Sequence, residues 1–63
     1  MTEKEALKIY DLLREAHKDI NRIYREHPAL RDENTVEGNA IQAVHSVLYL
    51  AEGYFAAIGR GKP

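Results

Sequence analysis

Three aromatic rings in the first half of the chain recur at an interval that could serve a binding site. Tyr10, His17 and Tyr24 stand seven residues apart, so a helix would place them in one row. Flat rings in a row can stack nucleobases. Rings at the border of a helical contact more often widen the apolar contact while their polar tips reach water. The sequence leaves both interpretations open.

Four cations form a second row beside these rings. Arg14, Lys18, Arg22 and Arg25 follow one another at spacings of four, four and three residues. Acids interleave with them, which is typical of a solvated, salt-bridged helix face. Next to the rings, however, the cations could hold phosphate groups, because guanidinium planes pair with phosphates and stack on flat rings.

The second half of the chain offers fewer candidates. His45 and Glu52 lie two helical turns apart with Tyr49 between them, and these polar residues predict the least buried side of their helix. Tyr49 can add a stacking ring, and Arg60 can add a phosphate partner. The candidate ligand-binding residues are therefore Tyr10, Arg14, His17, Lys18, Arg22, Tyr24, Tyr49 and Arg60.

Patterns typical of catalysis or of metal binding are not found in the sequence. The chain has no nucleophile elbow and no phosphate loop, since its GRGK stretch follows a helix where such a loop must precede one. His17, His27 and His45 are too far apart in sequence to place two ligands on one helical face, and cysteine is absent. We expect a protein that is not an enzyme and that holds no metal or cofactor.

The elements that must position these side chains are helices. Thr2 followed by Glu5 three residues later is a capping box, so a first helix begins near Glu3. This helix runs to about residue 27, because Pro28 disfavours helical geometry in the residue before it and has no backbone donor. Residues 28–34 are then a polar turn.

A second helix follows this turn. Asn34 or Thr35 can cap its start, and Gly59 suits the position just after its end. Gly38 and Gly53 fall inside it, where a glycine costs about 1 kcal/mol relative to alanine. Close approach of another helix, or room for a ligand, would offset that cost.

Two helices on a short connection predict an all-α fold. We expect a single-domain antiparallel hairpin over residues 1–63, with helices at about 3–27 and 35–59 and a frayed tail at 60–63. The apolar residues follow a heptad pattern on each helix, and each seam should pack at the shallow angle of helical bundles. The first seam consists of Ala6, Ile9, Leu13, Ala16, Ile20, Ile23 and His27. The second consists of Ala40, Val44, Val47, Ala51, Tyr54 and Ile58.

The second helix is apolar well beyond its seam, whereas the first carries twelve charged residues between Glu3 and Glu26. One partner helix cannot cover so wide an apolar arc. We therefore expect the second helix at the centre of a homo-oligomeric helical bundle, with the first helix outside. The predicted oligomer interface consists of Ile41, Val44, Val47, Leu48, Leu50, Ala51, Tyr54, Phe55 and Ile58.

Charge and hydropathy argue against two further classes of partner. The net charge of −1 disfavours bulk nucleic-acid binding, which rewards an excess of Lys and Arg. Residues 36–58 are long enough to cross a bilayer, but Glu37, His45 and Glu52 fall among them and charges near a bilayer centre are costly. The first residues, MTEKEALK, lack the apolar region of a secretory signal, which predicts a cytoplasmic protein.

The charged first helix, the short HPALRDEN turn and the apolar second helix ending in LYLAEGYFAAIGR resemble the small helical hairpins of phage counter-defence sponges, the anti-CBASS and anti-Thoeris proteins. The resemblance covers mainly residues 28–60 and rests on Leu48, Ala51, Tyr54 and the Ala56-Ala57-Ile58 ending. It implies oligomers that sequester cyclic nucleotide signals without catalysis. The chain is also similar to the plasmid Rop family in length and hairpin-dimer architecture.

We therefore expect a non-enzymatic binding protein that self-associates through its second helix. The specific hypothesis, which the resemblance implies, is a phage-type sponge that holds a cyclic nucleotide immune signal between subunits. The alternative is a Rop-like dimeric adaptor or inhibitor that binds a host protein or a structured RNA. A scaffold without a ligand is the third interpretation.

Overall fold

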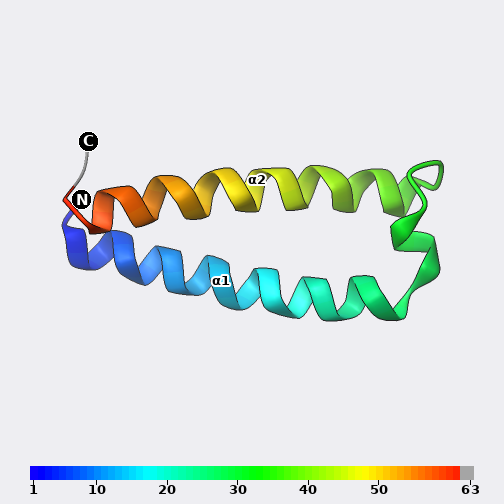
Figure 1. The fold of residues 1–63 in the computed structure, drawn as a ribbon, viewed down its shortest axis with the longest axis horizontal. Coiled ribbons are helices and arrows are strands. Elements are labelled where there is room, and N and C mark those ends of the chain that lie inside the picture. Colours follow the sequence, from blue (N-terminus) through cyan, green and yellow to red (C-terminus); the bar gives the residue numbers. More distant parts are fainter. Residues whose placement is uncertain (62–63) are drawn as a thin grey trace.

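The computed structural model describes residues 1–61, which form two antiparallel helices joined at one end (Figure 1). Helix α1 spans Glu3–Glu26, the short 3-10 helix η1 spans Pro28–Arg31, and α2 spans Val36–Gly59. No residue in this part of the chain belongs to a strand. The predicted all-α hairpin is confirmed, and both long helices lie within one residue of their predicted bounds.

Local sequence signals determine both ends of α1. The backbone N–H of Glu5 donates to the Thr2 hydroxyl at 3.1 Å, and the backbone N–H of Thr2 donates to the Glu5 carboxylate at 2.8 Å. The predicted capping box is therefore present. At the other end His27 is extended, with φ −121°, as the residue before Pro28 prefers to be.

The connection between the helices is more regular than the predicted polar turn, because Pro28 begins one turn of 3-10 helix. Thr35 caps α2, since its hydroxyl accepts from the Gly38 N–H at 2.9 Å and donates to the Ala29 carbonyl at 2.7 Å. A Cβ at Gly38 would collide with the Asp32 carbonyl oxygen. The turn therefore requires this glycine, and neither an approaching helix nor a ligand is needed to explain it.

Helix α2 ends at Gly59 as predicted, but the glycine just beyond its end is Gly61, so the prediction that Gly59 takes that position is wrong. Gly61 has φ +74° and donates its N–H to the carbonyl three residues earlier at 3.0 Å, as residues just beyond a helix do. Gly59 stays helical and buried, where a Cβ would collide with the Leu7 side chain. Of the predicted frayed tail, Lys62 and Pro63 lie outside the described residues.

Helix α1 faces its partner helix with the row of rings, and not with the whole of the predicted seam. The residues that it buries or half-buries along one line are Ala6, Tyr10, Leu13, His17, Ile20 and Tyr24. Ala6 is fully buried and His17 is 8% exposed. Ala16 and Ile23 are exposed although the heptad pattern places them in the seam. Relative to the heptad prediction, α1 is therefore rotated about its axis so that its row of rings faces α2.

Relative to the heptad prediction, α2 is rotated about its axis so that the edge with His45 and Glu52 faces α1. The predicted seam of α2 is therefore wrong. The line that α2 turns towards α1 consists of Gly38, Ile41, His45, Leu48, Glu52, Phe55 and Gly59. Val47 and Tyr54 from the predicted seam are 63% and 67% exposed. The apolar arc of α2 is wider than one helix can cover, so α1 takes one edge of it and the rest stays open.

The hairpin accordingly buries little apolar surface. Its buried hydrophobic residues are Ala6, Leu48 and Ala56, and no large side chain of residues 1–61 is fully buried. The accessible area is 4888 Å² for a chain of 7.2 kDa. A compact monomer of that mass exposes about 4,100 Å². The difference of roughly 800 Å² equals one partner's share of a standard protein–protein interface.

Candidate functional site

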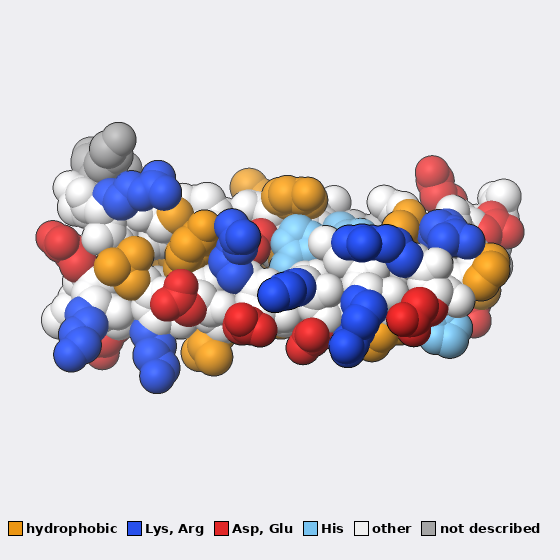
Figure 2. Space-filling model, turned by 60° about the horizontal axis from the view of Figure 1, so that its bottom comes forward, with side chains coloured by type: hydrophobic (Ala, Val, Ile, Leu, Met, Phe, Trp, Pro, Cys, Tyr) orange, Lys and Arg blue, Asp and Glu red, His pale blue; other side chains and the backbone are white. Residues whose placement is uncertain are grey.

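A groove runs along one side of the hairpin between α1 and α2. Its volume is about 760 Å³, and it is open to solvent. Figure 2 shows histidine side chains in the middle of the molecule, with Lys and Arg side chains on both sides of them. The groove is lined from α1 by Tyr10, Arg14, Glu15, His17, Lys18, Asn21 and Arg25, and from α2 by Tyr49, Glu52, Gly53 and Ala56.

A buried hydrogen bond between the two helices, from His17 to Glu52, lies at the bottom of this groove. Nδ1 of His17 is 3.0 Å from Oε2 of Glu52, and each side chain is about one-tenth exposed. Within residues 1–61, Oε1 of Glu52 has no hydrogen-bond donor, and it is not sealed from solvent. Because Glu52 lines the groove, this oxygen is an acceptor that a bound molecule can reach.

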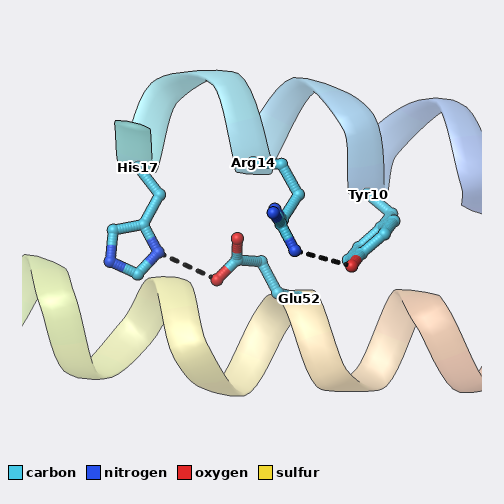
Figure 3. A network of polar contacts seen from close by, with 4 residues as sticks. All are labelled: Tyr10, Arg14, His17 and Glu52. Atoms are coloured by element: carbon cyan, nitrogen blue, oxygen red, sulfur yellow. Dashed lines mark hydrogen bonds and ion pairs between the residues drawn. The ribbon is translucent and has the colours of Figure 1, made fainter. Parts of the chain in front are cut away.

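The guanidinium of Arg14 lies between Tyr10 and Glu52 in Figure 3. Its Nη1 donates to the Tyr10 hydroxyl oxygen at 3.2 Å. This hydrogen bond, and the attraction of the same hydroxyl, raise the pKa of Arg14. The arginine is therefore a permanent positive charge at the rim of the groove.

Three cations at this rim make no direct ion pair within the described chain, although the carboxylates of Glu15 and Glu52 line the same groove. Arg14, Lys18 and Arg25 form no ion pair within residues 1–61. Of the predicted salt-bridged face, the structure contains one pair, Arg22 with Asp19 at 3.8 Å, and both side chains point into solvent. The rim therefore keeps three charges that an anion can use.

The rings between the helices form a continuous cluster. His17 meets Tyr49 edge-on at 4.9 Å between ring centroids and lies 5.6 Å from His45, which meets Tyr24 edge-on at 5.1 Å. The prediction that His45 and Glu52 mark the least buried side of their helix is wrong, because both face α1. Glu52 is paired across the helices, and the Nε2 atom of His45 is buried without a hydrogen-bond partner in the part of the chain described.

The structure brings five of the predicted ligand-binding residues together and leaves three apart. Those that line the groove are Tyr10, Arg14, His17, Lys18 and Tyr49. Those that do not are Arg22, Tyr24 and Arg60. Arg22 faces solvent, Tyr24 packs against a ring between the helices, and Arg60 stands at the end of α2. The ligand-binding role of the first group stays a prediction.

Sequence reasoning did not assign Glu15, Asn21, Arg25, Glu52, Gly53 and Ala56 to a site, yet these residues also line the groove. Asn21 stands one turn after His17, and Gly53 stands one turn after Tyr49. The three- and four-residue spacing on each helix would have found both, had the rotation of the helices been known. Arg25 was recognised as a cation of the basic row that could hold phosphate, but it was not among the eight candidate ligand-binding residues.

Gly53 differs from the other glycines inside α2. A Cβ at this position would meet no atom within 4 Å, whereas one at Gly38 or Gly59 would collide with the chain. An exposed glycine inside a helix costs about 1 kcal/mol relative to alanine. Nothing in the described residues explains why α2 carries a glycine at the edge of the groove.

The other side of the hairpin is apolar. Successive residues of an α-helix are separated by 100°. By this geometry, the apolar residues next to the contact between α1 and α2 lie, on both helices, on the side away from the groove. From α1 these are Ile9, Leu12, Ala16 and Ile23, and from α2 they are Val44, Val47, Ala51 and Ile58. Leu12 is 60% exposed, and Val36 and Leu50 are still more exposed on the outer surface of α2.

The predicted oligomer interface divides into three groups in the structure. The exposed members are Val44, Val47, Leu50 and Tyr54. The half-buried members are Ile41, Ala51, Phe55 and Ile58. Leu48 is buried inside the hairpin, so it belongs to the hairpin's own core, because the rotation of α2 turns it towards α1.

The described residues contain no group of three or more His, Cys, Asp or Glu side chains that could hold a metal ion. Neither helix in this range is both long enough and apolar enough to cross a membrane. Comparisons of the chain with family models, with curated proteins and with solved structures find no match.

Proposed function

We propose that this chain is a non-enzymatic binding protein that self-associates through its apolar side and holds an anionic nucleotide in its groove. The observation that carries the proposal is the difference between the two sides of the hairpin. Three cations, two carboxylates and aromatic rings line one side, and uncharged apolar residues gather on the other. One side therefore suits a charged, flat ligand, and the other suits a second copy of the chain.

The chemistry of the groove favours a nucleotide over a simple anion. Arg14, Lys18 and Arg25 can hold phosphate oxygens, while Tyr10 and Tyr49 offer flat faces for a base. Arg14 and Arg25 are eleven residues apart on α1, which is about 16 Å along a helix. This length accommodates more than one phosphate, as in the cyclic dinucleotides that the resemblance to phage sponges implies.

Self-association is supported by the area that the hairpin leaves exposed. Its excess over a compact monomer is roughly 800 Å², close to what one partner buries in a stable complex. The apolar residues on this surface come from both helices, with α2 as the larger contributor. The groove remains open on the other side, so this association leaves it accessible to a ligand.

Thermal unfolding in the presence of a panel of nucleotides tests the proposal. The panel consists of cyclic dinucleotides, cyclic ADP-ribose and their linear counterparts. A ligand at one hundred times its Kd stabilises the folded state by about 2.7 kcal/mol, which raises the melting temperature. The double variant Arg14→Ala, Lys18→Ala should lose the shift, whereas Arg22→Ala should keep it because Arg22 lies outside the groove. A flat response to the whole panel would contradict the proposal.

The second candidate is an adaptor or inhibitor that binds a host protein or a structured RNA. The observation that favours it is the exposure of Val36, Leu50 and Tyr54, which a partner's apolar groove could also cover. If the chain is an adaptor, one defined partner should be recovered with it from a cell lysate. Variants with changed surface charges on α1 should no longer recover that partner. The nucleotide-binding proposal predicts that such charge variants away from the groove keep their ligand.

A further inference from the structure

The carboxylate of Glu52 restricts which chemical groups can bind beside it in the groove. This carboxylate is nine-tenths buried, and one oxygen is already held by His17. The other oxygen accepts no hydrogen bond within residues 1–61, and the neighbouring Arg14 donates to Tyr10 instead. A carboxylate oxygen repels phosphate and other acceptors, so the part of the ligand that reaches it must donate an N–H or an O–H.

Gly53 marks the place where the ligand can come closest to α2. It follows Glu52 directly, lines the same groove, and leaves open space where a side chain would stand. Tyr49 stands one helical turn earlier and lines the same groove. We call the open space beside Gly53 the slot, and a Cβ at position 53 would project into it.

We propose that the groove selects a nucleobase that carries an amino group, laid over Gly53 so that this amine donates to Oε1 of Glu52. The inference rests on the proposed function and names the chemical class of ligand for the same site. The base lies against α2, and Arg14 and Lys18 on the facing strip of α1 take the phosphate. A base that presents only an oxygen at this edge leaves the carboxylate unpaired.

Binding of three nucleotides that differ only in the base tests this selection on the wild-type chain. Guanosine, adenosine and purine-riboside forms of the same cyclic dinucleotide are titrated by calorimetry, and the purine-riboside form has neither an amino group nor a ring N–H on its base. The better of the two amino-bearing forms should bind about ten- to a hundredfold tighter than the purine-riboside form, as the loss of a hydrogen bond to a charged group predicts. In Glu52→Gln, whose amide is neutral, the ratio should fall below about threefold.

Two results would overturn the inference while leaving the proposed function standing: equal binding of all three forms by the wild type, or a preference that survives in Glu52→Gln. Binding by none of the forms would refute the proposed function, and the inference with it. Because the comparison of ligands uses the wild-type chain, it stays decisive even if the variant does not fold.

Gly53→Ala tests where the base lies. The added methyl meets no atom of the free chain, so the variant should fold with at least the wild-type melting temperature. It should nevertheless weaken binding of every form tenfold or more, because the methyl occupies the slot. Ser46→Ala is the matched control, since it lies on the same helix outside the groove. Wild-type affinity in Gly53→Ala would contradict the placement of the base over Gly53.

Discussion

Leu50 is the position at which assembly can be tested most cleanly, because the hairpin itself leaves this side chain 76% exposed. In an isolated hairpin, Leu50→Glu removes no buried contact and should change the free energy of unfolding by less than about 0.5 kcal/mol. If copies meet at this surface, the change removes a burial that stabilises by about 1.5–3 kcal/mol. It also leaves an unpaired carboxylate in the contact, at a cost of about 3–5 kcal/mol. The combined effect weakens association by more than about a thousandfold.

Sedimentation equilibrium and circular dichroism at about 50 μM measure this effect. If the substitution weakens the dissociation constant into the millimolar range, the chain is dissociated at that concentration. The wild type should have a mass that is a multiple of 7.2 kDa and should be helical. Leu50→Glu should lose that mass, either as a 7.2 kDa species or as an unfolded chain. Gln42→Glu is the control, because it adds the same charge at an exposed position on the polar edge of α2. An unchanged mass in Leu50→Glu, or a folded wild-type monomer, would refute the reasoning.

Three further predictions concern stability. His45→Phe keeps the ring between the helices and removes a buried nitrogen without a partner, so it should stabilise by about 1 kcal/mol and raise the melting temperature by about 4–8 °C; a decrease would show that this nitrogen is bonded. Gly38→Ala should destabilise because its Cβ collides with the turn, whereas Gly53→Ala should stabilise by up to about 1 kcal/mol, and equal melting temperatures would contradict the contrast. The backbone N–H and the hydroxyl of Thr2 lower the pKa of Glu5, so its contribution to stability is complete above pH 4.5 and is lost as the pH falls through the lowered pKa. The free energy of unfolding of Glu5→Gln should therefore fall less steeply than that of the wild type as the pH is lowered below 4.5.

The ends of the helices were predictable because the groups that determine them are neighbours in the sequence. Thr2 and Glu5 complete their hydrogen bonds within three residues, and Pro28 acts on the residue directly before it. Such signals do not depend on what the helix packs against. The left-handed glycine after α2 was placed two residues too early, because either of two glycines could take that position. The choice between them depends on Leu7, which fills the space beside Gly59.

The rotation of the helices was not predictable in the same way, and the site depends on it. A heptad pattern identifies the most apolar line on a helix, but in a two-helix chain that line need not face the sister helix. On α2 the apolar line remains open, and the line that faces α1 contains His45 and Glu52. An acid among polar neighbours usually indicates solvent. Its partner, His17, is 35 residues away, so no local pattern reveals the pair.

The contact between the helices links the two sides of the hairpin. A ligand that bridges Arg14 on α1 and Glu52 on α2 would hold the two helices at a defined separation, and the same separation sets the shape of the apolar side. A ligand that binds the assembled form more tightly must favour assembly, and assembly must then tighten ligand binding by the same factor. Leu50 does not line the groove, yet Leu50→Glu should therefore weaken nucleotide binding as well as association. Full ligand affinity in a dissociated Leu50→Glu hairpin would show that each chain binds its ligand independently.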